Sequence, residues 1–303
     1  MRYIGNDIKL MVNDLLVNYT DLGPEDAPVI IFIHGFPLNK TMWDNQVELL
    51  KNEFRVIAYD LRGHGESDAG NEAFSIDLLV SDLIGFMDSL RIEKASLCVL
   101  SMGGYIALNA VENYPDRFDA MVLCDTTCMA DSPETKEKRM KAVENIIKNG
   151  VSEYAGSSIN NLFAKKSFTS NAAVVASVKE MIVNTSELVL CSTLLALASR
   201  NETCSKLSDI KVPVLILVGQ EDILTPPAAS KLLNENIKNS VMYIIEHAAH
   251  LSNLENQEVF NEQLKRFFES THKQQLQSLN TGDHSILKEI RDKLTMLLTF
   301  RSI

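Results

Sequence analysis

The sequence lacks long apolar runs and clustered positive charge, the features by which proteins bind membranes and nucleic acids. No stretch approaches about 18 consecutive apolar residues, which predicts that no helix crosses a membrane. Residues 1–14, MRYIGNDIKLMVND, contain no apolar core, so no secretory signal is expected. Positive charge is also scarce, because 29 Lys and Arg against 40 Asp and Glu leave a net charge of -11. Nucleic acids and anionic membranes need clustered positive charge, so we expect neither as a partner.

Cysteines and metal-ligating residues are equally sparse. The 5 cysteines include no C-x-x-C pair, which favours buried, reduced thiols in a cytoplasmic protein. His247 and His250 have no third ligand at suitable spacing, so no metal site is predicted. The string DLRGHGES (60–67) lacks the lysine of a phosphate loop and the spacing of a dinucleotide fingerprint, so we interpret it as a structural turn and expect no cofactor. The cysteines are Cys98, Cys124, Cys128, Cys191 and Cys204.

Apolar, β-branched runs alternate with stretches of helical period along most of the chain. A length of 303 residues permits two ordinary domains or one domain with an insertion. The alternation predicts βαβ units and a mostly parallel α/β sheet, preceded by an antiparallel edge hairpin over 8–23. The expected strands are 29–35, 55–60, 95–101, 119–125, 212–219 and 240–246. The expected helices are 41–52, 75–90, 102–114, 227–236 and 255–269.

One interval breaks this alternation. Residues 127–208 show helical periodicity and no strand-like run, and a structureless loop of that length would be unusual. We therefore predict a core of residues 1–126 and 209–270 with a helical cap of residues 127–208. Residues 271–303 form a C-terminal extension in which apolar residues recur at helical spacing over 286–298. This amphipathic helix is expected to pack on its own chain, with a homodimer contact as the alternative.

Ser101 stands between an apolar strand and a helix, in the string VLSMGG (99–104). That string is similar to the nucleophile elbow G-x-S-x-G, in which a sharp strand-to-helix turn exposes the serine oxygen. Val99 occupies the first glycine position, where overpacking costs about 1–3 kcal/mol. We expect the fold to tolerate Val99 and the serine to remain usable.

Two further residues follow predicted strands in the order of a serine-hydrolase triad. Asp222 comes directly after the strand at 212–219, and His250 follows the last strand. Open α/β sheets place their sites at the carboxyl ends of parallel strands, and the chain order Ser, Asp, His is the one expected for α/β-hydrolases. His250 would then act as the base for Ser101, with Asp222 orienting its imidazole. Asp125, at the end of the strand 119–125, is the alternative acid.

The loop HGFP (34–37) follows the first parallel strand and can turn a backbone N–H toward the serine. We assign the oxyanion hole to the N–H groups of Phe36 and Met102, and a structural role to His34. The substrate pocket is expected to be lined by apolar side chains, with Arg200 facing a substrate carboxylate. The candidate lining residues are Phe36, Met102, Met129, Phe163, Leu190 and Leu194.

Five strings together resemble the α/β-hydrolase superfamily over residues 8–270. They are HGFP (34–37), YDLRGHGES (59–67), LSMGG (100–104), GQEDILTPP (219–227) and AAHLSNLE (248–255). The resemblance implies an α/β-hydrolase fold with a mostly parallel eight-stranded sheet, helices on both faces and a helical cap insertion. Within the superfamily the sequence is most similar to 3-oxoadipate enol-lactonases, whose serine, aspartate and histidine would correspond to Ser101, Asp222 and His250.

These observations favour a serine hydrolase that acts on a small carboxylic ester or lactone through an acyl-enzyme on Ser101. A hydrolase of carbon–carbon bonds with the same triad is the alternative enzyme. A protein of the same fold that binds a small ligand without turnover is the alternative outside catalysis, because of Val99. The expected partner is a small-molecule substrate.

Overall fold

The computed structural model describes residues 2–274 and 277. The chain divides into two compact units, Met1–Gln263 and Leu264–Ile303, and the sheet belongs to the first. The strands are β1 (Gly5–Val12), β2 (Leu15–Leu22), β3 (Val29–Ile33), β4 (Arg55–Tyr59), β5 (Ala95–Leu100), β6 (Phe118–Cys124), β7 (Val214–Gly219) and β8 (Ser240–Ile245).

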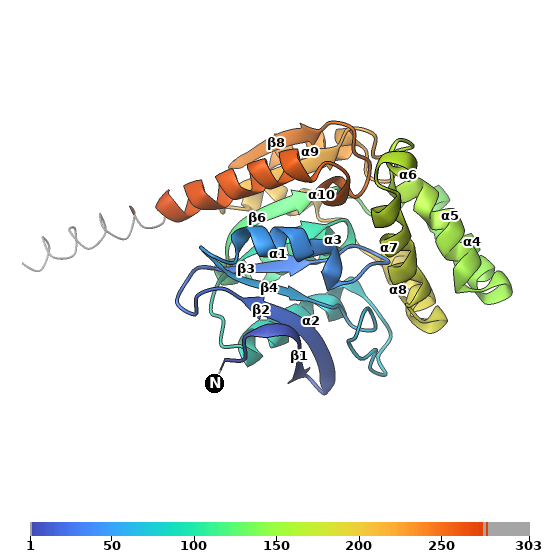
Figure 1. Ribbon diagram of the computed structural model, residues 1–303, viewed down its shortest axis with the longest axis horizontal. Helices are drawn as coiled ribbons and strands as arrows, with labels where there is room; N and C mark the ends of the chain where they lie inside the picture. Colours follow the sequence, from blue (N-terminus) through green and yellow to red (C-terminus); the bar gives the residue numbers. More distant parts are fainter. Residues whose placement is uncertain (1, 275–276, 278–303) are drawn as a thin grey trace, which may run out of the picture. The chain divides into compact units, whose positions relative to one another are not determined.

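Helices connect or follow most of these strands (Figure 1). The α-helices are α1 (Asp44–Leu50), α2 (Ile76–Ser89), α3 (Met102–Asn113), α4 (Pro133–Asn149), α5 (Val151–Leu162), α6 (Ser167–Ser170), α7 (Ala172–Val183), α8 (Glu187–Ser199), α9 (Pro227–Asn236) and α10 (Ser252–Glu255). Short 3₁₀ helices are η1 (Lys40–Trp43), η2 (Pro115–Arg117) and η3 (Cys204–Asp209). Residues 257–274 form one more helix, so the predicted end at 269 is wrong.

The eight strands form a single sheet in the order β1-β2-β4-β3-β5-β6-β7-β8. The β1–β2 hairpin is antiparallel, as is the pairing of β2 with β4, and the remaining pairs are parallel. The hairpin turns at Asn13 and Asp14, whose φ values of 46° and 62° match the right-handed twist of the flanking strands. The predicted edge hairpin and mostly parallel sheet are therefore confirmed.

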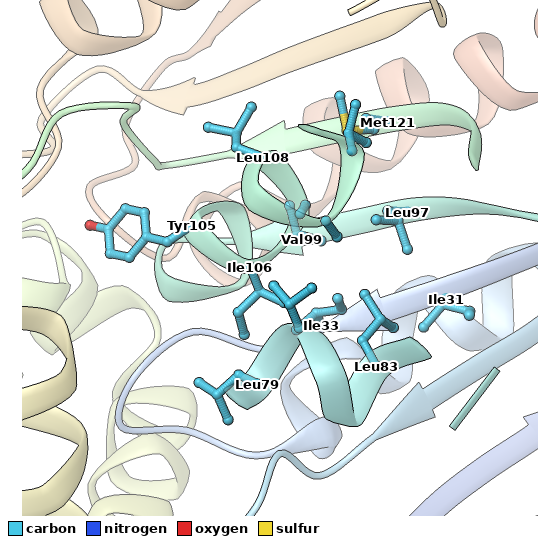
Figure 2. Packing of buried hydrophobic residues seen from close by; sticks show 14 of the residues in the cluster. Ile31, Ile33, Leu79, Leu83, Leu97, Val99, Tyr105, Ile106, Leu108 and Met121 are labelled. Carbon is cyan, nitrogen blue, oxygen red and sulfur yellow. The ribbon is translucent and has the colours of Figure 1, made fainter. Parts of the chain in front are cut away.

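Strand β3 shows why both faces of the sheet are buried. Its side chains alternate in direction, and Ile31 and Ile33 join the apolar cluster that contains Ile106 of α3 (Figure 2). Phe32 points to the other face, where its ring centroid lies 5.1 Å from that of Trp43. Because helices cover both faces, the central strands consist almost entirely of apolar residues.

Helices α4–α8 occupy the interval that the sequence assigns to a cap. No strand lies between Cys124 and Val214, all of which the structure describes. The helices belong to the same compact unit as the sheet, and the division into core and cap stays a prediction. The predicted amphipathic helix at 286–298 lies outside the described residues. Among the helices described, none alone is long and apolar enough to cross a membrane, and only α7 and α8, bent by 95° at their junction, meet that test as a pair.

The cysteines differ from the sequence prediction. Cys128 and Cys204 form a disulfide, so the expectation that all five are reduced is wrong. The two cysteines lie 76 positions apart, so no local spacing in the sequence indicates that they pair. Cys98 and Cys124 are buried free thiols, and Cys191 is a half-buried one.

Candidate active site

Ser101 forms the sharp turn between β5 and α3. Its φ of 52° and ψ of -111° lie in a region that non-glycine residues rarely occupy, and such a conformation persists only where the surroundings hold it. Here the Ser101 N–H donates to the Cys124 carbonyl at 2.9 Å, and the Thr126 hydroxyl donates to the Ser101 carbonyl at 2.7 Å. Both backbone groups of the serine are therefore fixed by the segment that ends β6.

The glycines around the serine permit close approach. A Cβ on Gly103 would lie 2.6 Å from the Ile33 carbonyl oxygen, and one on Gly104 would lie 2.2 Å from the Thr126 hydroxyl. Val99, in contrast, is completely buried in the apolar cluster beside Leu97 and Ile106 (Figure 2). The side chain at this position serves as core, so the departure from the elbow pattern leaves the turn intact.

The structure brings Ser101, His250 and Asp222 into one hydrogen-bonded chain. The Ser101 hydroxyl lies 2.8 Å from Nε2 of His250, and Nδ1 of the same ring lies 2.9 Å from Oδ2 of Asp222. The three residues follow β5, β8 and β7, so their meeting at one edge of the sheet is a consequence of parallel strands. Such a chain can move a proton from the serine oxygen to the histidine.

Asp222 is held by its own turn as well as by the histidine. Its Oδ1 accepts from the N–H groups of Leu224 and Thr225, at 2.8 and 3.0 Å, and its Oδ2 accepts from the Thr225 hydroxyl at 2.7 Å. Burial alone would raise the pKa of Asp222, but the His250 charge and these hydrogen bonds hold it below its usual value. The carboxylate therefore stays ionised and acts as a fixed acceptor for the imidazole.

Opposite effects act on His250. Burial alone would lower the pKa of this histidine, but the Asp222 carboxylate and its hydrogen bond outweigh burial and raise it above the ordinary value. The hydrogen bond to Asp222 directs the Nδ1 proton away from the serine. Nε2 is then the nitrogen that faces Ser101 as a base.

Asp125 lies near the chain but has other partners. Its Oδ1 accepts from the Gly219 N–H at 2.8 Å, and its Oδ2 accepts from the Ser252 hydroxyl at 2.5 Å. The hydrogen bond from the His250 ring goes to Asp222. The geometry thus favours Asp222 over Asp125 as the partner of the histidine.

The two predicted oxyanion donors flank the serine from different elements. Met102 is the first residue of α3, where backbone N–H groups have no acceptor within the helix. Phe36 follows β3 and lines the cavity beside Ser101. His34 bridges its own loop, since Nε2 accepts from the Leu61 N–H at 3.0 Å and Nδ1 lies 2.9 Å from the Gly35 carbonyl. Burial lowers the pKa of His34 to about 4, which keeps it a neutral structural residue.

A cavity of about 480 Å³ opens beside Ser101 and His250. Its lining comes partly from the sheet loops and partly from α4, α5 and α8, so the helical interval supplies one wall. The lining residues are Phe36, Pro37, Ser101, Tyr105, Thr135, Lys138, Arg139, Lys141, Ala142, Asn145, Tyr154, Ser157, Ser158, Asn161, Leu162, Leu194, Leu197, Leu224, Thr225 and His250.

Several predicted pocket residues lie elsewhere. Leu194 lines the cavity, but Leu190 is completely buried and Phe163 packs with its ring centroid 6.4 Å from that of Phe168. Met102 is buried beneath the turn, and Met129 is 53% exposed. The sequence shows that these side chains are apolar and that most of them lie on predicted helices. The direction in which each one points depends on how the helices pack.

Arg200 is also placed differently from the prediction. Its Nη1 donates to Asp131 Oδ1 at 2.6 Å and to the Leu197 carbonyl at 2.8 Å, and its Nη2 donates to the Met129 carbonyl at 2.9 Å. The guanidinium lies 4.1 Å from the ring centroid of Tyr105. Arg200 is therefore paired with Asp131, fixes the end of α8 and is not among the residues that line the cavity beside Ser101.

Glu255 is a residue at the site that the sequence did not indicate. Its Oε1 accepts from the Ala249 N–H at 2.7 Å, next to His250, and its Oε2 accepts from the Ala164 N–H at 2.8 Å and the Ser167 hydroxyl at 2.6 Å. It thereby ties the histidine loop to the helical interval. Ala164 and Ser167 lie 91 and 88 positions away from Glu255 in the sequence, and a local side-chain pattern cannot predict such contacts.

A comparison with known families identifies the fold of this chain. The model of the α/β hydrolase fold family matches residues 28–257. The chain belongs to this family. Within the described residues, no group of three or more His, Cys, Asp or Glu side chains is placed to hold a metal ion.

Individual relatives of this α/β hydrolase cover most of its length. The 3-oxoadipate enol-lactonase 1 of Acinetobacter baylyi is 31% identical over 248 residues, which are 82% of this chain and 91% of that protein. The structure of a thermophilic esterase from Thermogutta terrifontis, with malate bound, superposes with a TM-score of 0.82 at 31% identity, covering 88% of this chain and 98% of that one. The enol-lactonase from Burkholderia xenovorans gives a TM-score of 0.81 at 28% identity, covering 86% and 100%.

Proposed function

We propose that this protein is a serine hydrolase that cleaves a small carboxylic ester or lactone through an acyl-enzyme on Ser101. The observation that carries the proposal is the continuous hydrogen-bonded chain from Ser101 through His250 to Asp222, in which Ser101 and His250 line the 480 Å³ cavity. The similarity to enol-lactonases and esterases supports the same reaction class.

In the first half of the reaction, His250 takes the hydroxyl proton as the Ser101 oxygen attacks the substrate carbonyl carbon. The negative charge that develops on the carbonyl oxygen is stabilised by the N–H groups of Met102 and Phe36, each worth about 2.7–4 kcal/mol. Asp222 stabilises the imidazolium that forms. His250 then gives its proton to the leaving alkoxide, and the bond from the carbonyl carbon to that oxygen breaks.

In the second half, a water molecule attacks the acyl-enzyme. His250 accepts a proton from this water and returns it to the Ser101 oxygen as the acyl–serine bond breaks. The acid product leaves with the oxygen of the water. In a lactone the alcohol stays attached to the acyl chain, so the product is a single hydroxy acid or its keto form.

The cavity favours a substrate that carries a negative charge. Its described lining includes Lys138, Arg139 and Lys141 of α4 and contains no Asp or Glu. Arg139 shares Asp131 with Arg200, and Lys141 lies 2.7 Å from Glu137. Lys138 is exposed at the opening, where a Coulombic attraction to an anionic group raises the local substrate concentration.

The proposal is tested by labelling with a fluorophosphonate probe and by turnover of a panel of esters and lactones. Wild-type protein should be labelled and active, and Ser101→Ala should lose labelling and fall in kcat by on the order of 10⁶. Ser157→Ala is a matched control, because Ser157 lines the same cavity but is not part of the triad. A folded wild-type protein that takes up no label and cleaves nothing in the panel would refute the proposal in favour of a binding protein.

A further inference from the structure

Asp125 belongs to a short segment that contacts Ser101 and the two loops that carry Asp222 and His250. Cys124 accepts from the Ser101 N–H, and Thr126 donates to the Ser101 carbonyl. Between them, Asp125 reaches in the other direction, to Gly219 at the end of β7 and to Ser252 at the start of α10. Three consecutive residues at the end of β6 and just beyond it therefore meet the serine turn on one side and the aspartate and histidine loops on the other.

The carboxyl group of Asp125 adds a side-chain link between two loops that also share backbone hydrogen bonds, from the Gln220 N–H to the Ile245 carbonyl at 2.9 Å and from the Glu221 N–H to the Ala248 carbonyl at 2.8 Å. Gly219 precedes Asp222 by three positions, and Ser252 follows His250 by two. The carboxyl receives the Gly219 N–H at 2.8 Å on one oxygen and the Ser252 hydroxyl and N–H at 2.5 and 3.4 Å on the other. Its φ of 46° turns the chain so that the side chain points between the two loops.

We propose that Asp125 is a positioning residue that, together with these backbone hydrogen bonds, fixes the Asp222 turn against the His250 loop through its own hydrogen bonds to Gly219 and Ser252. The residue is completely buried and is not among the residues that line the cavity, so it has no contact with the substrate. Its effect reaches the reaction through the alignment of Asp222 and His250.

The ionisation of Asp125 fits this role. Burial is the largest effect on Asp125, and repulsion from the Asp222 carboxylate is the next. Together they raise the pKa of Asp125 to about 8, although His250 and the hydrogen bonds act in the opposite direction. Cys124, the other titratable group beside it, is a buried thiol whose own pKa is raised. At neutral pH the carboxyl is therefore mostly uncharged, and its contribution is geometric. A neutral amide of the same shape should replace it.

The test compares Asp125→Asn with Asp125→Ala, using p-nitrophenyl acetate for turnover. In Asp125→Asn, the amide oxygen can accept from Gly219 and the amide nitrogen can donate to the Ser252 hydroxyl, so most of the wild-type kcat should remain. Asp125→Ala loses both contacts, and kcat should fall by about 10- to 100-fold, since small misplacements of reacting groups have effects of this size. KM should change little because Asp125 does not line the cavity.

A second readout does not depend on turnover. The proton between Nδ1 of His250 and Asp222 gives a far-downfield NMR resonance, which should persist in Asp125→Asn and shift or broaden in Asp125→Ala. The kcat readout rests on the proposed function, but this resonance does not. If wild-type protein cleaved no ester, the proposed function would fail and the resonance alone would decide the role of Asp125.

Variants at Ser252 and Asp222 complete the test. Ser252→Ala removes the hydroxyl contact to the second carboxyl oxygen and keeps the longer N–H contact, so kcat should fall as in Asp125→Ala but by a smaller factor. This variant also serves as the test if Asp125→Ala does not fold. The inference is overturned if Asp125→Ala keeps the wild-type kcat and resonance, or if Asp125→Asn is as impaired as Asp125→Ala. It is also overturned if Asp222→Ala stays active and loses that activity only when Asp125→Asn is added, because Asp125 would then be the acid.

Discussion

The disulfide between Cys128 and Cys204 joins the segment that follows β6 to the start of η3, where the chain enters and leaves the helices α4–α8. Their Cα atoms are 4.9 Å apart, and the Thr203 N–H donates to the Cys128 carbonyl at 2.8 Å beside the bond. The covalent link and the hydrogen bond together hold the two ends of the helical interval side by side.

Removal of this disulfide is expected to destabilise the protein. A bond that closes a long loop restricts the unfolded chain, and such bonds contribute about 2–4 kcal/mol. The double variant Cys128→Ser/Cys204→Ser should therefore melt at a lower temperature than wild type in a calorimetric scan. Cys191→Ser, which changes a free thiol, is the control and should melt close to wild type. Equal melting temperatures for wild type with and without a dithiol reductant would contradict the expectation.

The pH dependence of the reaction should report His250. The reaction requires the neutral form of His250, and Asp222 raises the pKa of His250 above its ordinary value, so kcat/KM should fall as the pH drops through this raised pKa. Asp222→Asn removes the charge that raises the pKa, so the acid limb should move to lower pH. The same variant should lose on the order of 10⁴ in kcat because the imidazole is no longer held in the correct tautomer. An acid limb at the same pH in both proteins would argue against this assignment.

Gly219 should not tolerate a side chain. A Cβ at this position would lie 1.9 Å from the Ala249 carbonyl oxygen and 2.6 Å from that of Ala248. Gly219→Ala must push the histidine loop away, and we expect a loss of about 1–3 kcal/mol in stability together with reduced kcat. Gly156→Ala is the matched control, since nothing lies within 4 Å of its Cβ and α5 should gain about 0.5–1 kcal/mol. Chemical denaturation of the two variants measures the contrast.

Val99 is expected to be a necessary core residue. It is completely buried, so Val99→Gly would leave a cavity and loosen β5. Stability should fall by about 2–4 kcal/mol in urea denaturation, and kcat should not rise. A glycine variant that is as stable as wild type and turns over esters faster would show that the valine strains the serine turn.

Lys138 should favour substrates with a carboxylate near the opening of the cavity. Lys138→Ala should raise KM for a monoester of a dicarboxylic acid and leave KM for an uncharged ester of the same size unchanged. The difference should shrink as salt is added, because exposed charges are screened. Lys136→Ala is a suitable control, since Lys136 is an exposed residue of the same helix that does not line the cavity. The same KM change for both esters would indicate loss of packing rather than of charge.

The sequence by itself determined the parts of this protein that depend on local pattern. Apolar runs such as 29–33 predicted buried strands because parallel strands have both faces covered, and the alternation with helices predicted the sheet. The strings around Ser101, Asp222 and His250 marked turns at strand ends, and parallel strands bring such turns to one edge. The fold and these three positions could therefore be predicted from the chain alone.

The tertiary structure decided everything that depends on the direction of a side chain or on partners far away in sequence. Arg200 was predicted to face the substrate, but the packing of α8 pairs it with Asp131. The contacts of Asp125 to Gly219 and Ser252, and the bond from Cys128 to Cys204, connect residues 76 to 127 positions apart. No periodicity extends over such separations, because it is the packing of whole elements that brings these groups together.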